Sequence, residues 1–481
     1  MEKINAHIFE YLNKKYIFDV NKNAILSVSD EAYDEIKNNL FLNKESDLLE
    51  VNNLKRKGYL STNRPKRILH PKTEMVEGIL KRNVSKLCLQ LTQNCNFRCK
   101  YCVYSEAYEN RVHAMKKMDW NIAKKAIDFL ISHSQDALSI YIGFYGGEPL
   151  LQYDLIKKCM EYATNSVNGK KVAFTITTNG SLLNEEIVKD FIKYDVRVNV
   201  SLDGPRDIQN ENRVFADGQG TFDIVTNNIR VLCKKYPEFK ENLMYSMVLD
   251  PRNGFSCIEN FVKYDEELFS ESGITSSLIS QYYRQDSLNY SEEFISEWEF
   301  SKFKYMLYLI GKLSDKYNSK IMQPAFSGII EFINSTRENY AELGEVEHHS
   351  GPCIPGQVRL FTTIDGEFYP CEKVSENSKV MNIGNLNDGF YYDKIKKLLN
   401  AGQLTENECK NCFAIRHCDL CSMVADTGND KENKLSKELK MKACKSARIR
   451  LDDKLKDICA LKICNFNVDK FQMKGVKYES N

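Results

Sequence analysis

The chain has 481 residues, a net charge of +1 at pH 7 and 42% hydrophobic residues. This length exceeds one ordinary core and predicts two to four domains. The near-neutral charge gives no sign of a nucleic-acid or anionic-membrane partner. No apolar run approaches the roughly 18 residues that span a bilayer, and the N-terminus lacks a signal-peptide pattern. We therefore expect a cytoplasmic protein that binds neither nucleic acid nor membrane.

The first 75 residues predict a small separate domain. Alternation of apolar and polar residues at 6–11, 16–20 and 24–28 predicts a three-stranded meander. A helix capped by Ser29 and a second helix ending near Gly58 are expected to follow. Strands followed by helices indicate a winged-helix-like unit. A basic linker follows this unit and separates it from the rest of the chain.

From about residue 86 to 250, predicted strands alternate with amphipathic helices. The strands are Lys86–Leu91, Leu138–Phe144, Val172–Thr177, Val196–Ser201 and Leu243–Val248. The helices are Trp120–Ser132, Tyr153–Ser166, Asn184–Tyr194 and Phe222–Lys235. Such βα repeats predict the α/β class, with a parallel sheet or barrel and functional loops at the carboxyl ends of its strands. Helices are expected at 292–342, and short segments organised by metal at 350–450.

Sixteen cysteines are many for a cytosolic chain, in which metal binding or catalysis is more common than disulfides. Cys95, Cys99 and Cys102 directly follow the first barrel strand. Three soft thiolates can hold one face of a [4Fe–4S] cube and leave one iron open, as a catalytic site requires. The alternatives are three buried thiols, or a zinc site with His113 as the fourth ligand.

With Tyr101 before its third cysteine, this group resembles the C-x3-C-x-φ-C signature of the radical S-adenosylmethionine (SAM) superfamily. Glycine-containing loops follow the next three strands, as in that superfamily. The resemblance implies a 5′-deoxyadenosyl radical generated from SAM, although no catalytic base can be assigned. The residues that it implies for SAM binding are Tyr101, Gly146, Gly147, Glu148, Pro149, Ser201 and Arg213.

Seven later cysteines resemble the SPASM extension, which carries auxiliary clusters. The spacing between the last two cysteines of the tight quartet is two residues here, whereas three is usual. The resemblance implies two auxiliary [4Fe–4S] clusters and three clusters in all. Because this sequence lacks the extra ligand that is usual near Cys353, we expect one auxiliary cluster to keep an open iron. The implied ligands are Cys409, Cys412, Cys418 and Cys444 for one and Cys353, Cys371 and Cys421 for the other. A zinc ribbon built by the 409–421 quartet is the alternative.

Together these features resemble ribosomal-peptide maturases that form thioethers, the ranthipeptide or SCIFF-maturase type. The implied domains are a winged-helix-like leader-peptide recognition domain (1–75), a partial (β/α)6 radical SAM barrel with bridging helices (82–340), a SPASM domain (345–450) and a tail (451–481). The implied partners are a precursor peptide, bound through its leader by strand addition, and flavodoxin or ferredoxin as electron donor.

Three other functions remain open from the sequence. Two are enzymatic: carbon–carbon or ether crosslinking of peptides, and sulfatase-type oxidation of Cys or Ser to formylglycine. The third is an iron–sulfur DNA-binding regulator that uses the winged-helix-like unit, although the near-neutral charge and the SAM-type loops disfavour it.

Overall fold

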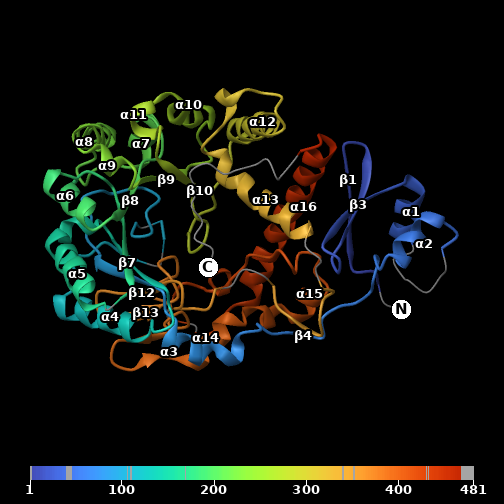
Figure 1. The fold of residues 1–481 in the computed structure, drawn as a ribbon, viewed down its shortest axis with the longest axis horizontal. Helices are drawn as coiled ribbons and strands as arrows, with labels where there is room; N and C mark the ends of the chain where they lie inside the picture. The colour runs from blue at the N-terminus through green and yellow to red at the C-terminus, as the bar shows by residue number, and fades with distance from the viewer. Residues whose placement is uncertain are drawn as a thin grey trace.

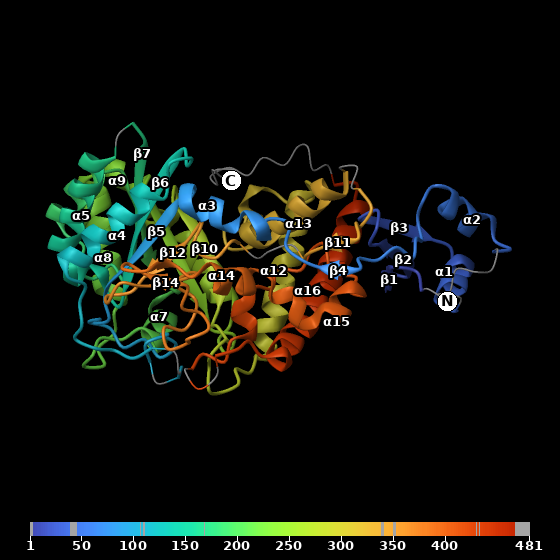
Figure 2. The ribbon, with the colours of Figure 1, turned by 90° about the horizontal axis from the view of Figure 1, so that it is seen from below.

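The computed structural model describes residues 3–38, 46–105, 107–108, 111–167, 169–337, 341–349, 353–429, 431 and 433–466. These residues form an elongated molecule with an α/β barrel at one end and the N-terminal unit at the other (Figure 1, Figure 2). Between them lie α12 (Glu292–Leu309), α13 (Met322–Arg337) and α16 (Lys437–Ile463). No helix in these ranges is long and apolar enough to cross a membrane. Half of the predicted C-terminal tail, residues 467–481, lies outside the described residues.

Six neighbouring parallel strands form the barrel wall, in the order in which they occur in the chain. They are β5 (Lys86–Thr92), β6 (Ser139–Gly146), β7 (Lys171–Thr178), β8 (Val196–Ser201), β9 (Leu243–Leu249) and β10 (Gly273–Leu278). Strand β5 is buried on both faces, as parallel strands covered by helices are, whereas β9 alternates between buried and partly buried residues. The predicted α/β class and partial (β/α)6 barrel are confirmed.

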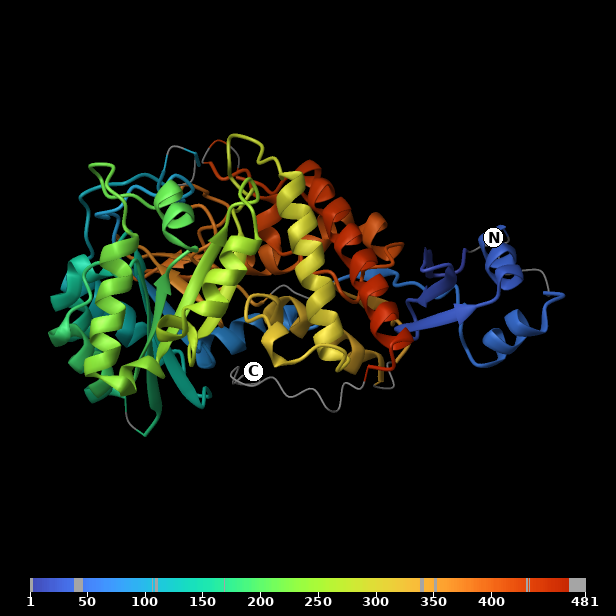
Figure 3. The ribbon, with the colours of Figure 1, turned by 90° about the horizontal axis from the view of Figure 1, so that it is seen from above.

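The barrel helices cover the outside of this sheet (Figure 3). They are α4 (Trp120–Ser132), α5 (Tyr153–Ser166), α6 (Glu185–Lys193), α7 (Arg206–Asn212), α8 (Phe222–Lys235), α9 (Pro237–Lys240), α10 (Ser256–Tyr264) and α11 (Glu266–Phe269). Side-chain caps fix where two of them begin: Asp119 accepts a hydrogen bond from the Asn121 amide (2.7 Å), and Asn184 accepts one from the Ile187 amide (3.1 Å). The loops between strands and helices are therefore left to carry function.

Four short C-terminal strands extend the barrel sheet beyond β5. Strand β12 (Leu360–Thr362) pairs in parallel with β5, and β13 (Glu367–Tyr369), β14 (Gly384–Asn385) and β15 (Gly389–Phe390) continue the sheet in antiparallel fashion. Strand β12 therefore lies between β5, which leads to Cys95, and β13, which ends two residues before Cys371. The remaining elements are β4 (Arg67–Ile68) paired with β11 (Val346–Glu347), α3 (Val76–Arg82), α14 (Tyr392–Leu399) and α15 (Glu406–Lys410).

The N-terminal unit consists of an antiparallel meander followed by two helices. Its elements are β1 (Ala6–Tyr11), β2 (Lys14–Asp19), β3 (Ala24–Val28), α1 (Asp30–Asn38) and α2 (Leu49–Arg56). The Ser29 hydroxyl accepts a hydrogen bond from the Ala32 amide (3.2 Å), which confirms the predicted N-cap. Ile17, Ala32, Ile36 and Val51 form a small core of its own. The predicted strands and helices of this unit are confirmed.

The meander packs against the loop between Cys412 and Cys418. Arg416 of that loop donates hydrogen bonds to the Val20 carbonyl (2.8 Å) and the Asn21 carbonyl (3.1 Å). His417 donates to the Asn23 side-chain oxygen (2.6 Å). A separate contact stacks the ring of His7 on Phe413, with ring centroids 3.9 Å apart. The N-terminal unit is thus bound directly to a cysteine-bearing loop.

Helix α16 differs from the expectation of short segments up to residue 450. It begins after Ser436, whose hydroxyl accepts a hydrogen bond from the Leu439 amide (3.3 Å), and runs without a break to Ile463. No Gly or Pro interrupts it, and Leu451, Leu455 and Ile458 bury one face. The boundary expected between residues 450 and 451 therefore falls inside a continuous helix.

Candidate functional site

The first cysteine group lies in the loop that leaves β5. Cys99 is buried, and Cys95 and Cys102 are partly buried. Burial raises the pKa of Cys99 to about 12, and the charges of Cys102 and Cys95 add to this increase. The three thiols are therefore close enough to influence one another. A buried thiolate needs nearby positive charge, which iron would supply.

The loop after β6 packs directly on the first cysteine loop. The Gly147 amide donates to the Thr92 carbonyl (2.8 Å), and the Glu148 amide donates to the Asn94 carbonyl (2.9 Å). A Cβ atom at Gly147 would lie only 2.1 Å from that same Asn94 oxygen, so this position requires glycine. Pro149 begins the short 3-10 helix that follows. The four loop residues predicted for SAM binding thus lie beside Cys95.

The Glu148 carboxylate is used inside the protein. It accepts hydrogen bonds from the Thr178 hydroxyl (2.7 Å), the Asn179 amide (2.7 Å) and the Leu150 amide (3.0 Å). Burial raises its pKa, and these hydrogen bonds oppose that increase. The Asn179 side chain also reaches the Cys95 sulfur, at 3.9 Å. Glu148 therefore holds the β6 and β7 loops together around Cys95, and Asn179 is a contact that was not predicted.

Arg213 and Tyr101 belong to a buried network with Asp203. Arg213 Nε donates to the Tyr101 hydroxyl (2.7 Å) and to Asp203 Oδ2 (3.1 Å), and the Tyr101 hydroxyl donates to the same carboxylate oxygen. Arg213 Nη1 lies 3.9 Å from the Cys99 sulfur. Ser201, at the end of β8, is buried two residues before Asp203. Asp203 was not among the predicted site residues, because only the folding of the chain brings it to the cysteine loop.

Arg111 links the loop after Cys102 to the segment after Cys371. Its side chain is 1% exposed, and its Nε lies 2.6 Å from Glu376 Oε1. Its Nη2 donates to the Glu372 carbonyl (2.7 Å). Gln90 of β5 donates to the same Glu376 carboxylate (2.8 Å). No motif marked these residues, since an isolated Arg and Glu carry no spacing signal.

His113, considered as a zinc ligand, stacks on Tyr104 with ring centroids 5.6 Å apart. Burial lowers its pKa, and the charge of Arg98 lowers it further. Its position in the structure is explained by this packing.

The second cysteine group brings Cys371 to Cys353 and Cys421. Burial raises the pKa of Cys371 to about 11, with further increases from the charges of Glu372, Cys421 and Cys353. The three residues come from the segment before β12, the end of β13 and the segment before α16. Fifty residues separate Cys371 from Cys421, so the fold and not local spacing joins them.

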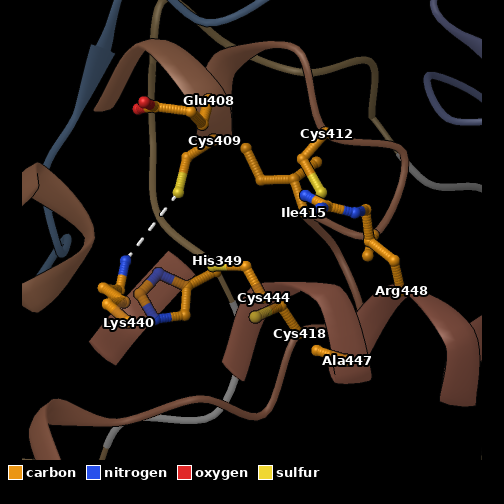
Figure 4. Close-up of a pocket in the computed structure, with 11 residues that line it drawn as sticks. His349, Glu408, Cys409, Cys412, Ile415, Cys418, Lys440, Cys444, Ala447 and Arg448 are labelled. Atoms are coloured by element: carbon orange, nitrogen blue, oxygen red, sulfur yellow. Dashed lines mark hydrogen bonds between the residues drawn. The ribbon is translucent and has the colours of Figure 1, made fainter. Parts of the chain in front are cut away.

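The third group surrounds a small pocket with a cavity volume of about 20 Å³ (Figure 4). Its lining includes Cys409, Cys412, Cys418 and Cys444. Burial raises the pKa of Cys418 to about 12, and the charges of Cys412 and Cys444 add to this increase. The ten predicted cysteines thus fall into groups of three, three and four, in the division that the SPASM resemblance implies.

The donor chemistry of all three groups suits iron–sulfur clusters, because each consists of cysteine sulfurs. In the described ranges, no three His, Cys, Asp or Glu side chains are already arranged around a position for a single metal ion. The groups are therefore defined by the mutual influence of their thiols and, for the third, by a shared pocket.

Comparison with known proteins identifies the barrel. The sequence profile of the radical SAM superfamily matches residues 89–264, which run from β5 to α10. Residues 89–264 are a radical SAM domain. A radical SAM domain is an enzyme domain, and the family uses SAM and a [4Fe–4S] cluster, which the cysteine group at the end of β5 fits.

The radical SAM domain has relatives with named activities. The cysteine-type anaerobic sulfatase-maturating enzyme of Clostridium perfringens (strain 13 / Type A) is 23% identical over 73% of this chain and 92% of its own. The radical SAM cyclopropyl synthase TigE of Paramaledivibacter caminithermalis is 24% identical over 70% of this chain and 68% of its own. Alignments to two other curated relatives span only 59% and 42% of their lengths.

A solved structure shares the fold of the radical SAM domain and the region after it. The structure of anSMEcpe with bound AdoMet and Kp18Cys peptide has a TM-score of 0.56 and 21% identity, and covers 79% of this chain and 99% of its own. At this identity the likeness concerns the fold alone.

Proposed function

We propose that this radical SAM enzyme installs thioether bonds between a cysteine sulfur and a carbon atom in a ribosomally made precursor peptide. The observation that carries the proposal is the group of Cys353, Cys371 and Cys421. Three protein thiolates leave a fourth iron of a cube available to a sulfur from elsewhere. A substrate cysteine is a ligand of the right chemistry for that position.

SAM bound at Cys95, Cys99 and Cys102 would supply, after one-electron reduction by flavodoxin or ferredoxin, a 5′-deoxyadenosyl radical able to take a hydrogen atom from an unactivated carbon. The chain's own residues prepare this site. Glu148 ties the β6 and β7 loops together beside Cys95, and Asp203 fixes Tyr101 and Arg213 beside Cys99. Their burial keeps water from the reacting centre.

The N-terminal unit would recognise the leader of the precursor. In the described residues β3 pairs with β2 alone, so its other edge can accept a peptide strand. The meander packs on the loop between Cys412 and Cys418 through Arg416 and His417. A leader held at β3 would therefore be tied to the cluster-bearing part of the enzyme.

The test is mass spectrometry of a Cys-containing precursor peptide after anaerobic reaction with the reconstituted enzyme, SAM and dithionite. We expect a loss of two hydrogens per bond, one from the carbon and one from the thiol, and protection of the cysteine from alkylation. The same peptide without its leader is the matched control and is expected to react poorly.

Formylglycine formation is the second candidate, favoured by the similarity to sulfatase-maturating enzymes. Its product would lack the cysteine sulfur altogether. A product that retains sulfur with two hydrogens fewer supports the thioether proposal, whereas loss of sulfur overturns it in favour of formylglycine. Loss of two hydrogens with a cysteine that still reacts with alkylating reagents would instead indicate carbon–carbon or ether crosslinking.

A further inference from the structure

Lys440, on the first turns of α16, is a buried cation beside the third cysteine group. It is only 1% exposed. Its Nζ donates to the Thr405 hydroxyl (2.6 Å) and lies 4.0 Å from the Cys409 sulfur. Thr405 itself lies 3.3 Å from that sulfur. Figure 4 shows the lysine amine pointing toward Cys409 across the pocket.

In the part of the chain that the structure describes, Lys440 forms no ion pair with Asp or Glu. Glu408 lines the same pocket, but its carboxylate pairs with Lys437 (2.8 Å), and the charge of Lys440 contributes less than that of Lys437 to the lowered pKa of Glu408. A buried ammonium without a counter-charge in direct contact is costly. Negative charge on the cysteine group would provide that counter-charge.

Arg448 brings a second positive charge to the same group. It lies two turns further along α16 and lines the pocket. Its guanidinium points toward Cys412 in Figure 4, and its charge and hydrogen bond oppose the increase in the pKa of Cys412 that burial causes.

His349 also lines the pocket, but it contributes no positive charge to this cysteine group. Its Nε2 donates to the Leu420 carbonyl (2.6 Å), and its buried Nδ1 has no hydrogen-bond partner among the residues that the structure describes. A neutral ring with its proton on Nε2 has only a lone pair on Nδ1. The positive charge at this group therefore comes from Lys440 and Arg448.

The buried and half-buried cations beside the other two cysteine groups are paired with carboxylates, and the unpaired ones, Arg98 near Cys102 and Lys373 near Cys421, are exposed to solvent, which screens their charge. Arg213, next to Cys99, is paired with Asp203 at 3.1 Å. Arg359, whose charge acts on Cys353 and Cys371, is paired with Glu372 at 2.7 Å. Net charge and hydrogen bonds to sulfur set the reduction potential of an iron–sulfur cluster, and nearby positive charge stabilises the reduced, more negative state.

We propose that Lys440 and Arg448 are the counter-charges of a cluster held by Cys409, Cys412, Cys418 and Cys444, and that they give this cluster the highest reduction potential of the three. This inference rests on the proposed iron–sulfur sites but not on the bond that the enzyme forms. The role that we propose for this cluster is to accept an electron, because one-electron reduction adds a negative charge that the two cations stabilise. Lys440 and Arg448 are thus positioning residues and touch no substrate.

The test is a dithionite redox titration of the full-length reconstituted chain, followed by EPR. Cys409→Ala identifies the signal of this group. Lys440→Met is expected to lower the midpoint potential of that signal, and Lys440→Arg, which retains the charge, is expected to preserve it. Lys442→Met is the matched control, because it removes an exposed lysine two residues away on the same helix that pairs with Glu438.

An unchanged midpoint potential in Lys440→Met would overturn the proposal, as would a Cys409→Ala variant with the iron content of the wild type. If Lys440→Met loses the cluster, iron retention in Lys440→Arg decides: retention supports the counter-charge role, and loss in both variants indicates a steric role and overturns it. If Lys440→Met shows the expected decrease in midpoint potential but the enzyme does not modify the peptide, the result would count against the proposed function alone.

Discussion

Replacement of Cys95, Cys99 and Cys102 together by alanine is expected to remove about four irons per chain from the reconstituted protein. It is also expected to abolish formation of 5′-deoxyadenosine from SAM. The reason is that these three thiols lie in one loop at the end of β5 and influence one another's pKa. The other seven predicted ligands form two separate groups. Iron analysis and chromatography of the nucleoside products measure both effects.

Cys257→Ala is the matched control for this triple variant. Cys257 is exposed on α10 and belongs to none of the three groups. It should leave both iron content and 5′-deoxyadenosine unchanged. A triple variant that kept the full iron content would show that the group at the end of β5 holds no cluster.

Asp203→Ala is expected to lower the free energy of unfolding of the barrel by about 3–5 kcal/mol, the usual effect of removing one partner of a buried ion pair. The change leaves the buried Arg213 guanidinium without its carboxylate and the Tyr101 hydroxyl without its acceptor. It also removes the acceptor of the Val248 amide (3.0 Å). Because Arg213 and Tyr101 adjoin Cys99, the variant should retain less iron at the first cysteine group.

Urea unfolding of wild type and variant side by side measures the stability change, and iron analysis measures retention. Asp207→Ala is the control, since Asp207 is an exposed carboxylate four residues further along, in the first turn of α7. Equal stability of the two variants would show that the Asp203 network contributes little to the site.

Much of the barrel and its motifs could be predicted from the sequence. Five of the six strands contain apolar runs, so their bounds were predicted to within two residues, as for β6 at Ser139–Gly146. Strand β10 (Gly273–Leu278) was not predicted, because three of its six residues are Ser or Thr. Cys95, Cys99 and Cys102 lie within one loop, so their spacing indicates that they bind a common metal centre. The glycines at 146 and 147 were identified by resemblance to the superfamily loop, and the structure explains them, because only glycine permits the close approach to Thr92 and Asn94.

The remainder depends on contacts between residues far apart in the chain. Arg111 meets Glu376 across 265 positions, and Lys440 reaches Cys409 from a different element. No periodicity or motif indicates such meetings. The docking of the meander on Arg416 and His417 is similar, because hydrogen bonds to backbone carbonyls such as that of Val20 leave no trace in the residue types involved. Helix α16 was not predicted, because its many lysines make the apolar face formed by Leu451, Leu455 and Ile458 difficult to recognise in the sequence.

The most direct test of a SAM-binding cluster at the end of β5 is the EPR spectrum of the anaerobically reduced enzyme before and after addition of SAM. Three protein thiolates and one open iron predict a [4Fe–4S] signal that changes when SAM is added, and that is absent from the Cys95, Cys99 and Cys102 triple-alanine variant. A spectrum indifferent to SAM, or zinc in place of iron at these three cysteines, would contradict the account.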